Sequence, residues 1–506
     1  MSSLILTSLL AVSLAASGFA TPLSTHPYDI PSERSSIAFA PLMVSHHPHG
    51  SVNNSYIVMF KDGISTALMQ NHWNFLQAVH VEHPLLDDVD GLSQVYDGHV
   101  KGYAGKFSEG AVQRIRQMPE VDFVEADQIV RTLDIDVDAH VDAVETQKSA
   151  PWGLARISHR AKLTFGTFSK YLFSKEGGSG VDVYVIDTGV NIRHVEFEGR
   201  AYWGKTIPQG DTDEDANGHG THCSGTIASR KYGVAKAANI IAVKVLGSNG
   251  SGSMSDVVGG VVWAAQSAAA KAVAAAKELA LTGKTKHKGS VANMSLGGGK
   301  SRALDDTVNK AVDQGMHFAV AAGNDNRDAC NNSPAAAEKA VTVGASTLGD
   351  ERAYFSNFGP CVDVFAPGLQ IRSTYIGSDT AESILSGTSM ASPHTAGLLA
   401  YLLSIYPSST FDPFVSPDLV PPSPLLQGFP STSFSSIYAL THASLPGWVS
   451  IFLPPPQLVG EALLPVPKTM TPKQLKVALL ALATEDALSV IPTDTPNLLI
   501  FNNATA

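Results

Sequence analysis

The chain of 506 residues has few cysteines, no long uninterrupted apolar segment and no cluster of basic residues. Its three cysteines, Cys223, Cys330 and Cys361, allow at most one internal disulfide and leave one thiol over. No segment reaches the ~20 consecutive apolar residues of a spanning helix, so we expect no stable membrane span. The absence of Lys and Arg blocks, together with a net charge of -11, argues against nucleic acid as a partner.

The N-terminal region also lacks Lys and Arg ahead of its apolar run, Leu4 to Ala16. This run is too short to span a bilayer and is followed by small residues, which is typical of a secretory signal peptide cut near Ala20. We therefore expect a signal peptide over residues 1–20 and an extracellular or vacuolar destination on the secretory pathway. Residues 21–50 are rich in Pro, Ser and His without periodicity and are predicted to be a linker.

Two folded regions follow this linker. Residues 51–135 contain strand-like and helix-like segments in alternation, which predicts a small α+β domain. A charged, aperiodic stretch then separates this domain from a larger one, predicted over residues 145–506. In the larger domain, helical segments separate strands that are apolar at nearly every position. This pattern predicts an α/β fold with a parallel sheet covered by helices on both faces.

Four polar residues are expected at one edge of this sheet, because sites in such folds form beyond the carboxyl ends of the strands. Asp187 and Asn324 each follow an apolar strand, while His219 and Ser389 each begin a helical segment. Nucleophilic acyl transfer needs a hydroxyl, an imidazole, a carboxylate that orients the imidazole, and donors for the oxyanion. These four residues supply one of each, with Asn324 as the oxyanion donor.

The segments that carry these residues, "VIDTGV", "NGHGTHCSG", "AAGN" and "SGTSMASPH", occur in that order and resemble the signatures of subtilisin-like serine proteases. "APWGLARIS" and the cysteine of the second motif resemble the proteinase K branch, in particular the fungal cerevisin-type vacuolar enzymes. The order Asp, His, Ser excludes the α/β-hydrolase alternative. That alternative also requires a glycine where Ala391 stands.

The resemblance implies a serine endopeptidase of broad specificity that forms an acyl-enzyme on protein and peptide substrates. The small domain would be a ferredoxin-like propeptide that acts as an intramolecular inhibitor. Cleavage near Val144 and Glu145 would then release a monomeric enzyme that needs no cofactor.

Several further sites are implied by the same resemblance. Two glycine-rich segments and the pocket beside Asn324 would bind an extended substrate. The residues assigned to this role are Gly250, Gly252, Met254, Ser295, Leu296, Gly297 and Gly323. Cys330 and Cys361 would form a disulfide, and Asp363 would bind a structural calcium ion with backbone carbonyls near Glu338 and Ala340.

Alternatives stay open for some of these features. His219, His222 and Cys223 could form half of a zinc site, although no His-Glu-x-x-His helix is present. The proline-rich segment 408–468 departs from the family pattern, as a surface insertion or as mistranslated sequence. A non-catalytic interaction protein with this fold is the rival function, but it would be expected to lack a triad or oxyanion residue.

Overall fold

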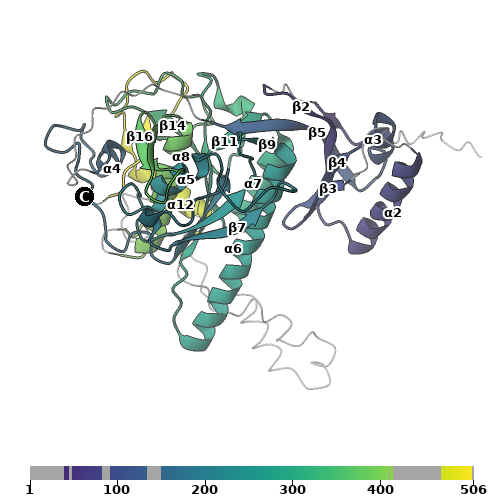
Figure 1. The fold of residues 1–506 in the computed structure, drawn as a ribbon, viewed down its shortest axis with the longest axis horizontal. Helices are drawn as coiled ribbons and strands as arrows, with labels where there is room; N and C mark the ends of the chain where they lie inside the picture. The colour runs from purple at the N-terminus through teal and green to yellow at the C-terminus, as the bar shows by residue number, and fades with distance from the viewer. Residues whose placement is uncertain are drawn as a thin grey trace, which may run out of the picture. The chain divides into compact units, whose positions relative to one another are not determined.

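The computed structural model describes residues 39–44, 48–82, 92–133, 150–408, 411–413 and 469–503 (Figure 1). The expected signal peptide, most of the expected linker, the Val144–Glu145 bond and nearly all of segment 408–468 lie outside these residues.

The larger domain is built on a sheet of nine described strands. In spatial order they are β18 (Thr484–Glu485), β19 (Leu498–Leu499), β15 (Val364–Pro367), β14 (Val341–Ser346), β12 (His317–Ala321), β10 (Gly289–Met294), β6 (Val181–Asp187), β8 (Asn239–Lys244) and β7 (Ala201–Thr206). All neighbours are parallel except β18 and β19. The expected α/β fold with a parallel sheet is therefore confirmed.

Helices cover both faces of this sheet, and strand β6 shows why its sequence is apolar throughout. Val183 and Val185 lie in one buried cluster, whereas Tyr184 and Ile186 lie in another. The first cluster includes residues of α5 (His219–Ala228), α8 (Thr388–Ile405) and α12 (Pro472–Leu482). The second includes residues of α6 (Met254–Thr282) and α7 (Arg302–Asp313). Burial on two faces removes the alternation that a one-sided strand would show.

The small domain forms the other large sheet, together with three short strands of the larger domain. Its own strands are β1 (Leu42–Met43), β2 (Ser51–Phe60), β3 (Leu92–Asp97), β4 (Lys101–Lys106) and β5 (Val121–Thr132). Its helices are α2 (Thr66–Glu82) and α3 (Glu109–Ile115). The three strands from the larger domain are β9 (Ser251–Ser253), β11 (Leu296–Gly299) and β13 (Asn332–Ser333).

Side chains alternate across this sheet. Val58 and Phe60 of β2 pack in a cluster with residues of α2 and α3, whereas Ile57 and Met59 belong to the cluster that contains α6 and α7. The sheet of the small domain thus lies between its own helices and two helices of the larger domain. The remaining described elements are α4 (Trp152–Ile157), η1 (Val195–Phe197), η2 (Ala329–Asn331), β16 (Ile371–Thr374) and β17 (Glu382–Leu385).

Two sequence predictions need correction here. Residues 21–50 were expected to be linker throughout, but Leu42 and Met43 form β1 and pair in parallel with β5. Strand β3 was not predicted, because its sequence "LSQVYD" is polar and pairs with β4 on one side only. Its Tyr96 is nevertheless buried and packs in the cluster that includes α6.

Helix α6 is long and apolar enough to cross a membrane by length and composition, which the sequence reading did not anticipate. Its first half is buried in the core, from Met254 to Ala268, and it covers the sheet in Figure 1. The second half is rich in alanine and is largely exposed. The apolar composition of α6 is therefore explained by burial of its first half in the core of a globular domain.

Candidate active site

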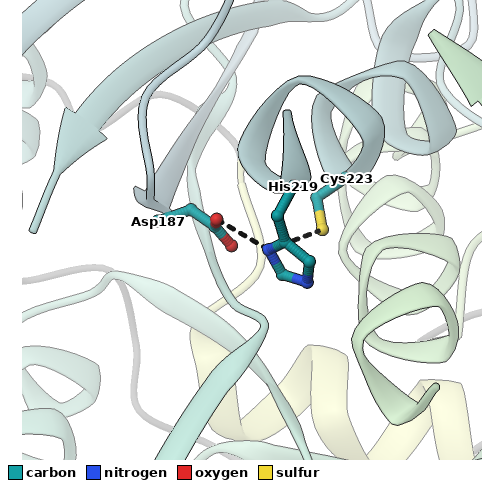
Figure 2. Close-up of side chains that lie close together, drawn as sticks. All are labelled: Asp187, His219 and Cys223. Atoms are coloured by element: carbon teal, nitrogen blue, oxygen red, sulfur yellow. Dashed lines mark hydrogen bonds and ion pairs between the residues drawn. The ribbon is translucent and has the colours of Figure 1, made fainter. Parts of the chain in front are cut away.

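Asp187 and His219 meet at the carboxyl edge of the sheet. Asp187 is the last residue of β6 and His219 the first of α5. Asp187 Oδ1 lies 2.7 Å from His219 Nδ1, and both side chains are buried (Figure 2). The backbone N–H of Thr188 also donates to this oxygen, at 2.7 Å. The carboxylate therefore favours a proton on Nδ1, which leaves Nε2 as the basic nitrogen of the neutral ring.

The electrostatic setting of His219 has two opposing parts. Burial acts to lower the pKa of the imidazole, and the opposite charge of Asp187 acts to raise it. The attraction prevails, so the pKa of His219 lies well above its ordinary value of 6.5. The ring can act as a base only above that raised pKa, which predicts activity at neutral to alkaline pH.

Cys223 lies one turn further along α5 and is completely buried beside the imidazole (Figure 2). Its Sγ is 3.9 Å from His219 Nδ1 and donates to the backbone oxygen of Ser389 at 3.4 Å. Burial raises the pKa of this thiol, so it stays protonated. Cys223 is the leftover thiol, and its contacts are those of a packing residue under the site.

The zinc alternative is not supported by this arrangement. His222 turns its Nε2 away from the other two residues to the backbone oxygen of Ile371, at 2.9 Å. Side-chain ligand atoms of Asp187, His219 and Cys223 do lie within 4.8 Å of one another. The hydrogen bonds among them account for this closeness.

Ser389 is the second residue of α8, so its backbone N–H lies in the first turn, where no intrahelical acceptor exists. Its Oγ donates to the backbone oxygen of Ser295 at 3.1 Å. His219 Nε2 has no hydrogen-bond partner among the described residues. The hydroxyl must therefore leave the Ser295 oxygen before it can transfer its proton to the imidazole.

Asn324 lies just beyond β12, and both ends of its amide are engaged. Its Oδ1 accepts from the backbone N–H and the hydroxyl of Thr388, each at 2.9 Å. Its Nδ2 donates at 2.7 Å to the backbone oxygen of Leu133, the residue that follows β5. The amide that was expected to stabilise an oxyanion thus holds a peptide carbonyl of the small domain.

The chain that leads to Leu133 lies between two strands of the larger domain. Residues of β5 pair antiparallel with β9, with Val130 opposite Gly252, and with β11, with Thr132 opposite Leu296. The Thr132 N–H also donates to the Gly250 oxygen at 3.0 Å. We call residues 129–133, with their partners in β9, β11 and Asn324, the cleft contact.

The residues expected to bind substrate fall into three groups. Gly250, Gly252, Leu296 and Gly297 line this strand, and an added Cβ at Gly297 would come within 3.2 Å of the Leu133 side chain. Gly323 precedes Asn324 with φ +105°, a conformation that favours glycine. Met254 and Ser295 are completely buried. Met254 packs in the same cluster as Val130, and the Ser295 hydroxyl donates to the Ser389 oxygen at 2.9 Å.

The other two implied sites lie away from this edge. Cys330 and Cys361 form a disulfide with a Cα–Cα distance of 5.3 Å. The oxygens expected around calcium do come together, but the ammonium group of Lys476 lies among them. It is 2.8 Å from Asp363 Oδ2, 3.0 Å from the Glu338 oxygen and 2.6 Å from the Ala340 oxygen. The residues present therefore do not fit a calcium ion at Asp363.

Comparison with known proteins relates this site to a family. Residues 178–418 match the Subtilase family, and residues 55–133 match Peptidase inhibitor I9. The chain is 50% identical over 497 residues to subtilisin-like serine protease Pen c 2 of Penicillium citrinum, covering 95% of this chain and 94% of that protein. The chain belongs to the subtilase family.

Two further relatives agree with this assignment. The protease is 51% identical over 466 residues to subtilisin-like serine protease Pen ch 18 of Penicillium rubens, which covers 89% of this chain and 81% of that protein. The crystal structure of a cold-adapted subtilisin-like serine proteinase superimposes with a TM-score of 0.50 at 37% identity. That match covers 70% of this chain and 98% of the solved one. The protease is thus a subtilisin-like hydrolase that carries an inhibitor I9 propeptide.

Sequence reasoning missed two buried carboxylates by which the propeptide holds the protease. Asp127 accepts hydrogen bonds from the N–H of Ser255 at 3.1 Å and from its hydroxyl at 2.8 Å, in the first turn of α6. Glu125 accepts from the N–H of Ala303 at 3.0 Å, in the first turn of α7. Helix N-termini favour such anionic acceptors. We call these two residues, with the first-turn donors that they bind in α6 and α7, the helix contact.

Burial makes Glu125 a weaker acid than an ordinary glutamate. It raises the pKa of this carboxyl to about 7, against the lowering effect of its hydrogen bonds to Ser301 and Ala303. The signal in the sequence was the three acidic residues of the strand "VDFVEADQIV", of which Glu125 and Asp127 are buried and Asp122 is half-buried. An acidic side chain in a buried strand needs a donor partner. The donors to Glu125 belong to the protease domain, whereas Asp127 also accepts from the propeptide's own Ser55 hydroxyl, at 2.9 Å.

Proposed function

We propose that the protease is made as a zymogen whose own propeptide is its first substrate, and that Ser389, His219, Asp187 and Asn324 carry out the reaction. The contact between Asn324 Nδ2 and the Leu133 oxygen, 2.7 Å, supports this most directly. A carbonyl that receives a hydrogen bond from the oxyanion donor is in the position of the bond to be cut.

In the proposed reaction, Ser389 Oγ gives its proton to His219 Nε2 and attacks the carbonyl carbon. Negative charge then develops on the carbonyl oxygen, where the Asn324 amide and the Ser389 backbone N–H donate hydrogen bonds. The imidazolium, stabilised by Asp187, returns the proton to the leaving amine as the C–N bond breaks. Water repeats these steps on the acyl-enzyme and releases the acid.

The same contact indicates which bond is cut first. Cleavage after Leu133 requires no movement of the propeptide strand, because the Leu133 carbonyl already lies at the oxyanion donor. We therefore propose the bond that follows Leu133 as the first processing site. The Val144–Glu145 bond expected from the sequence would then be a later trimming site.

The cleft contact also supports broad specificity. Its hydrogen bonds to β9 and β11 use main-chain groups, which every extended peptide offers. Side-chain preference would come from the positions of Val130 and Leu133, both apolar. Main-chain recognition of this kind suits a protease that digests many proteins.

We infer that the protease travels the secretory pathway to the extracellular space or the vacuole and acts as a monomer without a required cofactor. The N-terminal apolar run and the Cys330–Cys361 disulfide support an oxidising route. Asn53 and Asn331 are exposed sequons and are proposed glycosylation sites. The sequon at Asn293 is buried and bonded to Ser392, so it is excluded from this role.

The decisive experiment is Ser389→Ala in the full chain. Peptide hydrolysis should fall by about 10⁶-fold, a scale borrowed from removal of the triad serine in a related protease. The purified variant should also keep an uncut bond after Leu133, as read by mass spectrometry. Normal self-processing in this variant, in the absence of other proteases, would show that another nucleophile acts.

A further inference from the structure

The ammonium group of Lys476 is enclosed by three oxygens of the protease domain. Two are the backbone oxygens of Glu338 and Ala340, and the third is Asp363 Oδ2, at 3.0, 2.6 and 2.8 Å respectively. A lysine ammonium has three N–H groups, so each can point at one of these oxygens. The group is largely enclosed, with the Lys476 side chain 18% exposed and that of Asp363 22% exposed.

The three oxygens around Lys476 are of the kind that usually bind a metal cation. A carboxylate with two main-chain carbonyls is a donor set that hard cations such as calcium prefer. The same Asp363 oxygen also accepts from the Thr342 N–H at 2.8 Å, and the Asp363 N–H donates back to the Thr342 oxygen at 2.9 Å. The carboxylate is thereby fixed in place, as a cation ligand would be.

Charge explains why one cation excludes the other. Lys476 brings one positive charge to one carboxylate, which leaves the enclosed site neutral. A calcium ion beside the same ammonium would meet its repulsion at close range, with only one carboxylate to offset it. Calcium also takes six to eight oxygens, typically about 2.3–2.6 Å away, and cannot share three of them with an ammonium group.

We propose that Lys476 is a built-in replacement for a structural cation, so that the protease needs no calcium at this site. The lysine belongs to α12, whereas Ala340 directly precedes β14 and Asp363 directly precedes β15. The ion pair therefore ties the last described helix to the amino edge of the sheet. That edge is opposite to the catalytic one, so the tie contributes to stability and not to the chemistry.

Burial raises the pKa of Asp363 above its ordinary value, and Lys476 together with the Thr342 hydrogen bond offsets part of that rise. Removal of the ammonium leaves a mostly enclosed carboxylate and two carbonyls without their cation. A divalent cation can then take the vacated place, which is a gain of function that loss of packing alone would not produce.

The test uses the full chain with Ser389→Ala, so that self-digestion does not interfere. Lys476→Ala is added to this parent, and Lys473→Ala, an exposed lysine of the same helix, is the matched control. In EDTA, Lys476→Ala should lower Tm by about 3–6 °C, because a partly buried ion pair is broken. About 5 mM Ca²⁺ should restore at least half of this loss, since simple extracellular calcium sites bind at about 10⁻⁴–10⁻³ M.

Three comparisons decide the outcome. Parent and Lys473→Ala should show equal and smaller responses to Ca²⁺, and adding Asp363→Asn to Lys476→Ala should abolish the extra response. Equal calcium responses in parent and Lys476→Ala would overturn the proposal. If Lys476→Ala does not fold, the Tm of the parent and of Asp363→Asn is compared with and without Ca²⁺. A calcium-dependent rise in Tm that only the parent shows would mean that calcium displaces the lysine, and would overturn the proposal.

Discussion

The propeptide holds the protease at two places that differ in kind. The cleft contact consists mainly of main-chain hydrogen bonds from residues 129–133, and any extended peptide can form them. The helix contact consists of the carboxylates of Asp127 and Glu125 on the first turns of α6 and α7. A substrate can compete for the first but has no equivalent of the second. We therefore expect inhibition after self-cleavage to depend more on the helix contact than on the cleft contact.

Among the changes that test this difference between the two contacts, the one with the largest expected effect acts on cleavage and not on docking. Asp187→Asn should reduce kcat/KM by about 10⁴-fold, the scale known for other serine proteases, because the imidazole loses its correct tautomer. It should leave both propeptide contacts intact. In the unmodified protease kcat/KM should rise only at pH above 6.5, because Asp187 raises the pKa of His219. In the variant this rise should move to lower pH, as a pH–rate profile would show.

A second change should disturb the cleft contact alone. Leu133→Asp places a charge where the Leu133 side chain packs close to Gly297, and should slow cleavage after residue 133 by about 10³-fold. Leu133→Phe keeps an apolar side chain and serves as the control. N-terminal and C-terminal mapping of the processed fragments over time measures the rate. Equal rates for the two variants would remove Leu133 from the role of the first cleavage residue.

The third change should act on the helix contact through pH. The pKa of Glu125 is about 7 when docked against an ordinary 4.5, so the docked state binds the proton more tightly. Docking should therefore weaken as pH rises from about 4.5 to about 7 and stay constant above that. Glu125→Gln mimics the protonated acid and should remove this decline.

The measurement for Glu125 is the activity recovered when the self-cut complex is diluted at several pH values and assayed at one common pH. Between pH 5 and pH 8 the apparent Ki of the propeptide should rise by about 10-fold to 100-fold, and by less than about 3-fold with Glu125→Gln. A pH response equal in both proteins would assign the effect to another group.

The smallest effect is expected from an ion pair between the two domains that lies on the surface. Lys310 Nζ lies 2.6 Å from Asp62 Oδ1, but the side chains are 37% and 84% exposed. Lys310→Ala should therefore change the propeptide Ki by less than about fivefold, since exposed pairs contribute little. A larger change would mean that long-range charge, and not the helix contact, retains the cleaved propeptide.

The sequence allowed Asp187 and His219 to be placed at one edge of the sheet, where the structure brings them together, because one stands at the end of a strongly apolar strand and the other at the start of a helix. Asp187 and His219 needed only the rule that sites form beyond the carboxyl ends of parallel strands. The helix assigned to Ser389 begins at Thr388, one residue earlier than expected. Local pattern was enough for these positions.

Contacts between distant segments could not be read in this way. Lys476 is 113 positions from Asp363, and no local pattern distinguishes it from the exposed Lys473. The role of Glu125 and Asp127 follows only from their contacts with the first turns of α7 and α6, which the sequence of β5 alone does not predict. The calcium expectation at Asp363 did not foresee this contact for the same reason: the expected oxygens do come together, but the group among them is an ammonium from another helix.

The amide of Asn324 is held by hydrogen bonds from Thr388 to its oxygen, independently of what its nitrogen binds. The side chain therefore cannot rotate to present the oxygen to a substrate. Its rotational entropy is lost when the protein folds, and not during each cycle of the proposed reaction. Thr388→Val would remove the hydroxyl that helps to hold the amide, and turnover would then include the cost of ordering it.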